Sequence, residues 1–277
     1  MSRRTFMFDQ TVTILENKKV NAEYYKLAFR SKELSRRVLP GQFVQVQVEA
    51  GPDPLLRRPF SYYRVMKSRI ELLYEILGRG TQLLAEKKRG HHIKVLGPLG
   101  RPFSKNLHGK RRILVGGGVG VPPLVFLAEV VKREVRPLVF LIGCKSRAEV
   151  LPKRELSEIR GEVRYATNDG SYVKKGFVTV LLRDLLKRED PKTLFIQTCG
   201  PRAMMEAVMT IAKRFGIEGE ASVDERMACG IGVCLGCVVK TKSGFKTSCV
   251  EGPVFRFDEM EAGAGSPCHQ KQVSYGT

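Results

Sequence analysis

The chain has 277 residues, 43% of them hydrophobic, which is enough for two modest cores and a small additional module. No run approaches the roughly 18–20 apolar residues that a membrane helix requires, so we expect no membrane span. The net charge of +20 invites a nucleic-acid hypothesis, but the basic residues are scattered and we expect no nucleic-acid partner. Seven cysteines without a disulfide-like framework, and a start without an apolar signal segment, predict a cytoplasmic protein.

Residues 1–105 are predicted to be β-rich. Short apolar or alternating runs indicate strands, and Pro40-Gly41 is one of the turn signals that separate them. A short helix is compatible with residues 81–88. Strands are expected at residues 6–14, 24–29, 43–48, from 58 onward, 69–77 and 92–96. Six strands with one helix suggest a small closed β-barrel.

Residues 106–216 alternate between strand and helix patterns. Strands are expected at 113–115, 138–142, 163–166 and 194–198, and helices from Pro122 and at 177–186 and 204–215. This alternation predicts an α/β domain with a doubly wound parallel sheet. Residues 217–260 are expected to form a separate cysteine module, and residues 261–277, which show no periodicity, a mobile tail.

Four of the cysteines form the most informative motif in the chain. Cys229, Cys234, Cys237 and Cys249 follow the spacing C-x4-C-x2-C, with eleven residues before the fourth cysteine. This is the plant-type spacing of [2Fe–2S] ligands. Intervening glycines let the backbone turn its N–H groups toward the sulfurs. A hairpin formed by residues 238–242 and 245–250 would return the fourth cysteine to the other three.

A structural zinc site is the alternative interpretation of these cysteines. Zinc knuckles usually contain two close cysteine pairs, whereas this chain has a single C-x2-C and a glycine-rich x4 loop. The spacing therefore favours iron–sulfur over zinc. A zinc-bearing nucleic-acid-binding module remains a rival hypothesis from another class of protein.

Two elements of the β-rich region are candidate anion sites. Arg58-Pro59-Phe60-Ser61 places a guanidinium fork and a hydroxyl donor at the start of a strand, which suits a pyrophosphate. Gly80-Thr81 opens a short helix, and a helix N-terminus attracts anions. Taken alone, Arg58–Ser61 is a weak signal that fits a strand-entry proline beside a surface arginine better.

Two further motifs lie at the ends of expected parallel strands. Four glycines, Gly116, Gly117, Gly118 and Gly120, connect a strand to a helix and would let a nucleotide approach the helix N-terminus. Cys199, Gly200 and Pro201 follow another strand at the edge where ligands bind in open α/β sheets. Simple tight turns, with a buried cysteine in the second case, are the alternative interpretation.

As a set, these motifs resemble the ferredoxin–NADP reductase superfamily, and within it the iron–sulfur electron-transfer subunits of NAD-dependent class 1B dihydroorotate dehydrogenases. The resemblance covers about residues 5–260. Its most specific segments are LLRRPFS (55–61), LGPLGRPF (96–103), VGGGVGVPPL (115–124), NDGSYVKKGFVT (168–179), CGP (199–201) and DERMACGIGVCLGC (224–237).

The resemblance implies which residues bind each cofactor. FAD would occupy the barrel domain, and NAD the α/β domain at the glycine turn and the Cys199 segment; the [2Fe–2S] cluster would be held by the four cysteines. Glu75 departs from the pattern, which has a basic or neutral residue there. The implied FAD contacts are Arg58, Pro59, Phe60, Ser61, Leu73, Tyr74, Glu75, Gly80 and Thr81.

The implied function is electron transfer in pyrimidine biosynthesis. Electrons from dihydroorotate oxidation would pass through [2Fe–2S] and FAD to NAD⁺, because a flavin must stand between a one-electron cluster and a two-electron nicotinamide. The chain has no region for orotate formation, so the resemblance implies an FMN-containing dihydroorotate dehydrogenase catalytic subunit in a heterotetramer.

Two points stay open at the level of the sequence. A related reductase subunit of a hydrogenase, sulfide or ferredoxin–NADP system would share most of these motifs. Lys145 and Arg147 follow the second parallel strand and could suit the 2′-phosphate of NADP, whereas the resemblance favours NAD.

Overall fold

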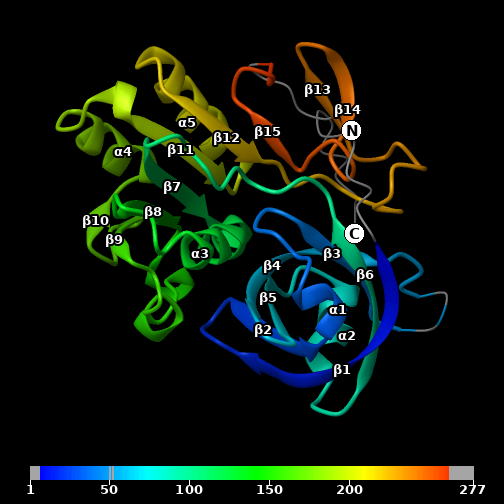
Figure 1. The fold of residues 1–277 in the computed structure, drawn as a ribbon. Coiled ribbons are helices and arrows are strands. Elements are labelled where there is room, and N and C mark those ends of the chain that lie inside the picture. Colours follow the sequence, from blue (N-terminus) through cyan, green and yellow to red (C-terminus); the bar gives the residue numbers. More distant parts are fainter. Residues whose placement is uncertain (1–6, 50, 52, 262–277) are drawn as a thin grey trace, which may run out of the picture.

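The computed structural model describes residues 7–49, 51 and 53–261. The expected mobile tail, apart from residue 261, lies outside the described residues, as does the first residue of the strand expected at 6–14. Figure 1 shows a barrel in blue and cyan beside a green-to-yellow α/β layer, with an orange hairpin above the barrel. No helix among the described residues is long and apolar enough to cross a membrane.

The predicted six-stranded closed barrel is confirmed. Its strands follow the order β1-β2-β5-β4-β3-β6 around the barrel, and all neighbours are antiparallel. Alternating side chains such as Val44 and Val46 fill its interior, as expected for half-buried strands. The strands are β1 (Phe8–Lys19), β2 (Tyr24–Arg30), β3 (Phe43–Gln47), β4 (Arg58–Met66), β5 (Arg69–Glu75) and β6 (His92–Leu99).

Two helices accompany the barrel, and one of them was not expected. The helix α1 (Lys32–Ser35) begins because the Ser31 hydroxyl accepts a hydrogen bond from the N–H of Leu34. A four-residue helix carries too little periodicity to be recognised in the sequence. The expected helix is α2 (Arg79–Glu86), which begins two residues before the predicted start.

The second domain is built on a seven-stranded sheet of order β10-β9-β8-β7-β11-β12-β15. All neighbouring pairs are parallel except β12 and β15, so the predicted doubly wound sheet is confirmed. Its strands are β7 (Arg111–Gly117), β8 (Leu138–Cys144), β9 (Gly161–Thr167), β10 (Lys174–Lys175), β11 (Leu194–Cys199), β12 (Glu218–Ser222) and β15 (Val254–Arg256).

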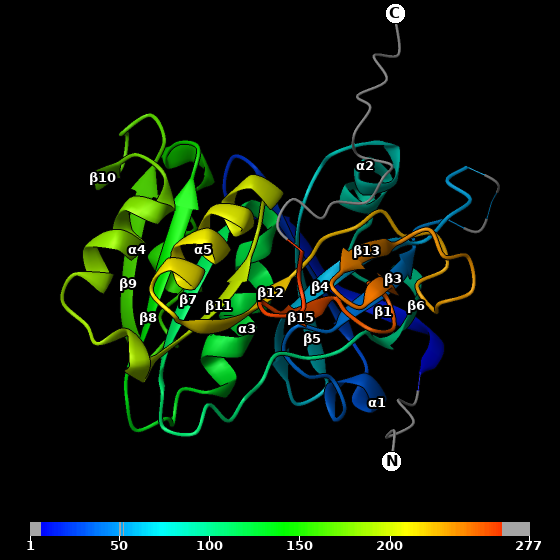
Figure 2. The same cartoon turned by 90° about the horizontal axis from the view of Figure 1, so that it is seen from above.

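Helices cover both faces of this sheet (Figure 2). The helix α3 (Val121–Val130) lies between the sheet and the barrel, and its Leu124 shares a core with Tyr63 and Leu73 of the barrel. On the other face lie α4 (Val178–Leu186) and α5 (Arg202–Arg214). Four 3₁₀ turns complete the domain: η1 (Gly118–Gly120), η2 (Arg147–Glu149), η3 (Lys153–Glu155) and η4 (Pro191–Thr193).

The cysteine-rich segment packs against the barrel. The hairpin of β13 (Val238–Thr241) and β14 (Gly244–Thr247) forms at the expected place. In Figure 2 the strand β13 lies near β3, and Cys237 and Cys249 pack with Phe43 of β3 and Leu99 of β6. The domain limits at 105, 216 and 260 stay predictions; within residues 217–260, β12 and β15 belong to the large sheet.

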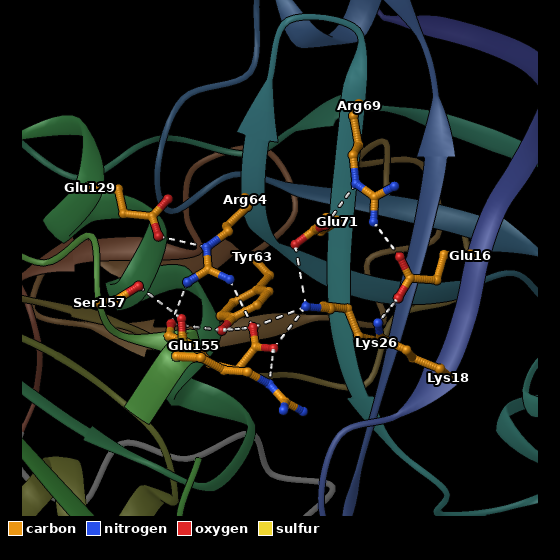
Figure 3. A network of polar contacts seen from close by, with 11 residues as sticks. Glu16, Lys18, Lys26, Tyr63, Arg64, Arg69, Glu71, Glu129, Glu155 and Ser157 are labelled. Carbon is orange, nitrogen blue, oxygen red and sulfur yellow. Dashed lines mark hydrogen bonds and ion pairs between the residues drawn. The ribbon is translucent and has the colours of Figure 1, made fainter. Parts of the chain in front are cut away.

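A buried ionic network joins the barrel to the α/β domain (Figure 3). Glu155, which is 4% exposed, enters from η3 of the α/β domain. Its carboxylate accepts hydrogen bonds from Lys26 of β2 at 2.9 Å and from Arg64 of β4 at 2.8 Å. The hydroxyl of Tyr63 approaches the same carboxylate at 3.1 Å. This network fixes one side of the boundary between the domains.

Candidate functional site

A cleft of about 1490 Å³ separates the barrel from the α/β domain and extends toward the cysteine-rich segment. Nearly all of the predicted nucleotide and flavin contacts line it. Gly116 is the exception: a Cβ there would lie 3.1 Å from Leu124 Cδ1, so this glycine serves packing under the helix. The predicted residues that line the cleft are Arg58, Pro59, Phe60, Ser61, Leu73, Tyr74, Glu75, Gly80, Thr81, Gly117, Gly118, Gly120, Cys199, Gly200 and Pro201.

The two predicted anion elements of the barrel lie against each other. A Cβ on Gly80 would be 2.8 Å from Nε of Arg58, so the glycine lets the guanidinium lie over the first turn of α2. Thr81 Oγ1 accepts hydrogen bonds from the N–H groups of Leu77 at 2.9 Å and Gly78 at 3.2 Å. A cation beside a helix N-terminus suits a phosphate group.

Arg57 is a cleft residue that the sequence reasoning did not single out. Its Nη2 donates to Asp9 at 2.8 Å, while its Nη1 is buried without a hydrogen-bond partner in the described part of the chain. A buried, unpaired guanidinium nitrogen at the cleft indicates a missing anionic or carbonyl partner. The sequence signal that could have identified Arg57 is its position directly before Arg58, a predicted phosphate contact.

Aromatic side chains form the barrel side of the cleft. The rings of Phe60 and Tyr74 meet edge to face, with centroids 5.7 Å apart. The Tyr74 hydroxyl donates to Asn17 Oδ1 at 3.0 Å, which fixes the orientation of the ring. A planar aromatic ligand such as an isoalloxazine ring fits a wall of this kind.

Glu75 ends β5 at the cleft, where its carboxyl is half-buried. Burial raises its pKa, and the nearby carboxylate of Glu149 adds to this effect, while a hydrogen bond with Tyr24 and the charge of Lys145 oppose it. Glu75, which differs from the basic or neutral residue of the family pattern, therefore puts an acidic group in the cleft near Lys145 and Glu149.

The glycine turn brings two backbone segments of the α/β domain into contact. Gly118 has a φ of +53°, in the left-handed region that favours glycine. At Gly120, a Cβ would lie 2.2 Å from the carbonyl carbon of Cys199 and 2.3 Å from the amide nitrogen of Gly200. Two of the predicted nucleotide motifs thus meet at the carboxyl ends of adjacent strands β7 and β11.

The thiol of Cys199 is buried at this junction. Burial raises its pKa to about 12, so the group is a neutral thiol at pH 7. Phe177, which is 69% exposed, also lines the cleft. From the sequence, Phe177 is expected only to begin a helix, because an exposed aromatic residue cannot be told from a core residue by spacing alone.

The four motif cysteines lie as two pairs. The backbone N–H of Cys234 approaches the sulfur of Cys229 at 3.5 Å, and the backbone N–H of Cys249 approaches the sulfur of Cys237 at 3.4 Å. Among the described residues no three metal-binding side chains converge on a single point. Two thiols for each of two irons is the arrangement that a [2Fe–2S] rhomb requires.

Backbone N–H groups surround the Cys229 sulfur. Those of Ile231 and Cys234 approach it at 3.4 and 3.5 Å. Although burial opposes ionisation, these donors lower the pKa of Cys229 to about 6. Cys249 differs because burial and the adjacent Cys237 raise its pKa to about 12. Positive φ angles at Gly230, Gly232 and Leu235 produce this loop conformation.

The donor set and the loop fit an iron–sulfur cluster, and the cleft fits a flavin and a nicotinamide nucleotide. Phe43 connects the two sites, because its ring lines the cleft and also packs with Cys237 and Cys249. A cluster held by these cysteines would therefore lie one aromatic ring from the cleft. From the sequence, Phe43 is expected only to lie in a strand, and its position between the two sites is not predicted.

Comparisons with known proteins agree with this geometry. Residues 224–261 match the family described as the iron–sulfur cluster binding domain of dihydroorotate dehydrogenase B, and residues 114–210 match the oxidoreductase NAD-binding domain. A solved structure described as an NADH-dependent reduced ferredoxin–NADP oxidoreductase superposes with a TM-score of 0.81 at 27% identity, covering 91% of this chain and 90% of the other.

Two curated relatives carry the same description, dihydroorotate dehydrogenase B (NAD(+)), electron transfer subunit. The relative from Desulforamulus reducens is 35% identical over 83% of this chain and 90% of its own length. The relative from a Geobacillus species is 37% identical over 92% of this chain and 99% of its own length.

The barrel, the nucleotide-binding sheet and the iron–sulfur module define a flavin- and nicotinamide-dependent oxidoreductase of the ferredoxin–NADP reductase type. More narrowly, the chain belongs to the family of electron-transfer subunits of NAD-dependent dihydroorotate dehydrogenase B. The family resemblance inferred from the motifs is confirmed, and membership favours iron–sulfur over the zinc-bearing alternative.

Proposed function

We propose that this chain carries electrons from a partner that oxidises dihydroorotate to orotate, through a [2Fe–2S] cluster and FAD, to NAD⁺. The observation that carries the proposal is the position of Phe43 between the cysteine pairs and the cleft. Bound in these sites, the cluster and the flavin would supply one-electron and two-electron transfer, respectively.

The residues have distinct tasks in this proposal. Arg58, whose guanidinium lies beside the first turn of α2, and Arg57, whose buried Nη1 is unpaired at the cleft, would hold the FAD phosphates. Phe60 and Tyr74 would orient the flavin ring. The junction of Gly120 with Cys199-Gly200 would position the nicotinamide nucleotide at the strand ends.

The proposed electron acceptor is NAD⁺ rather than NADP⁺. Lys145, which could bind a 2′-phosphate, is engaged by Glu149: the carboxylate accepts from the Lys145 N–H at 2.7 Å and lies 3.5 Å from its Nζ. A carboxylate at the end of the second strand favours ribose hydroxyls over a phosphate. Steady-state rates with NADH and NADPH test this preference.

The proposed partner is the FMN-containing catalytic subunit, in a heterotetramer. The cysteine loop exposes apolar side chains around the cluster site: Val233 is 76% and Leu235 61% exposed. An exposed apolar patch is typical of a protein interface. We also propose that the assembly is cytoplasmic, because none of the six described cysteines forms a disulfide.

Anaerobic purification tests the proposal. The protein is expected to contain FAD and equal amounts of iron and acid-labile sulfide, and to oxidise NADH with an artificial acceptor. Cys234→Ser is expected to lose the cluster but keep FAD and this activity, whereas Cys268→Ser, outside the motif, is expected to keep all three. A protein with zinc and without acid-labile sulfide would contradict the proposal.

A further inference from the structure

Gln45 lies on the outer face of β3, toward the cysteine-rich segment. Because side chains alternate along a strand, Val44 and Val46 point into the barrel, while Phe43 and Gln45 point outward. Phe43 on this face packs with Cys237 and Cys249. Gln45 is therefore a barrel residue that faces the proposed cluster site.

The amide of Gln45 is buried without a partner. Its side chain is 0% exposed, and neither Nε2 nor Oε1 makes a hydrogen bond within the described residues. Leaving a buried polar group unpaired costs about 1–3 kcal/mol. An unpaired buried amide next to a binding loop indicates that its partner belongs to the bound group.

The cysteine loop is shaped around this amide. Gly230, directly after Cys229, has a φ of +73°, and a Cβ there would lie 2.8 Å from both Cγ and Nε2 of Gln45. Only glycine at this position lets the amide come so close to the loop. The residue before Gly230 is Cys229, and a sulfur atom can accept a hydrogen bond from the N–H of an amide.

A second buried donor occurs next to another ligand. Ser248 precedes Cys249, its side chain is 0% exposed, and its Oγ has no hydrogen-bond partner among the described residues. Its backbone N–H donates to the carbonyl of Cys237 at 2.8 Å, which holds it between two cysteines. Unpaired donors thus occur beside two of the motif cysteines, Cys229 and Cys249.

We propose that Gln45 is a positioning residue of the cluster, whose amide donates a hydrogen bond to a cluster sulfur beside Cys229. This rests on the proposed function, since it requires the four cysteines to hold the cluster. Hydrogen bonds to the sulfurs stabilise the more negative, reduced state and so raise the reduction potential. Gln45 would thereby favour electron entry into the cluster from the partner.

The test compares Gln45→Leu with Gln47→Leu in the purified holoprotein. Leucine keeps much of the volume but cannot donate, and Gln47 lies two residues along the same face of β3. In a redox titration followed by electron paramagnetic resonance, Gln45→Leu is expected to shift the cluster potential to more negative values, and Gln47→Leu to match the wild type. Equal potentials in all three proteins would overturn the inference.

A second measurement needs no variant. The wild-type protein is prepared with glutamine labelled by ¹⁵N in its side chain, and the reduced cluster is studied by pulsed electron paramagnetic resonance. The spectra are expected to show coupling between the cluster spin and one amide nitrogen. The absence of this coupling would also overturn the inference. These outcomes differ from failure of the proposed function, in which the wild-type protein itself would contain no acid-labile sulfide and no reduced-cluster signal.

Discussion

Gly120 is the residue at which the nucleotide turn is packed most tightly. A Cβ there would meet the Cys199-Gly200 backbone at 2.2–2.3 Å, and backbone cannot move aside as a flexible side chain can. We expect Gly120→Ala to separate η1 from the end of β11 and to weaken NADH binding at least about tenfold, which corresponds to 1.4 kcal/mol. FAD content should stay unchanged, because the barrel lies across the cleft. Titration of the holoprotein with NADH measures the effect.

Gly118→Ala is the matched control in the same turn. Its φ of +53° makes alanine costly by about 1 kcal/mol, but no atom lies within 4 Å of the added Cβ. NADH affinity should therefore fall less than in Gly120→Ala. If the two variants bind NADH equally weakly, strain in the turn rather than contact with β11 explains the loss.

The sequence predicts which residue types gather at the cleft better than what each one does there. Four glycines in five residues indicated a nucleotide turn, yet three of them serve different purposes. Gly118 provides a left-handed φ, Gly120 a backbone contact, and Gly116 space for Leu124. Likewise the buried, unpaired Nη1 of Arg57 could not be foreseen, because hydrogen-bond satisfaction depends on the tertiary fold.

At the scale of elements, the cysteine loop connects the cluster site to the partner surface. Val233 is 76% exposed in this loop and has no role in the hairpin or the core. We expect Val233→Asp to prevent co-elution of the catalytic subunit on size-exclusion chromatography, because burying a new carboxylate in an apolar interface is costly. Iron and sulfide content should stay at the wild-type level.

Val173→Asp tests whether any exposed valine has this effect. Val173 is 77% exposed but lies beside β10, at the opposite edge of the sheet from β15. Co-elution should survive this change. Loss of the partner in both variants, or in neither, would argue against a docking surface on the cysteine loop.

The sequence predicted elements well where a periodic pattern was long. It did not predict which sheet a short strand joins, because strand pairing in the folded protein decides this. The barrel strands and the helices α4 and α5 lie within a few residues of their predicted positions. Their apolar residues recur regularly, with period 2 in the strands and 3.6 in the helices. By contrast, β12 and β15 fall in the range expected for the cysteine module but complete the large sheet. Only their pairing with β11 and with each other reveals this.

At the scale of the whole molecule, a buried carboxylate of the α/β domain, Glu155, joins it to Lys26 and Arg64 of the barrel. Burial opposes ionisation of Glu155, but hydrogen bonds and charges from Lys26 and Arg64 outweigh it and lower its pKa. Its folded pKa lies below the unfolded value, so Glu155 stabilises the protein fully above the unfolded pKa. This contribution is lost as the pH falls through the folded pKa. Lowering the pH into the acidic range should therefore loosen the contact between the domains, whereas pH changes around neutrality should not.

Glu155→Gln removes the charge that holds this network together while keeping nearly the same shape (Figure 3). Lys26 and Arg64 would remain buried, each about 10% exposed, without their shared carboxylate. We expect the free energy of unfolding at pH 7 to fall by about 3–5 kcal/mol, as for other broken buried pairs. Glu158→Gln, which breaks only the exposed 3.2 Å pair with Lys132, should cost no more than about 1 kcal/mol. Thermal unfolding of the holoproteins compares them, and equal losses would mean that the network contributes no more than a surface ion pair. Because the cleft lies along the same boundary, NADH affinity should also fall in Glu155→Gln and not in Glu158→Gln.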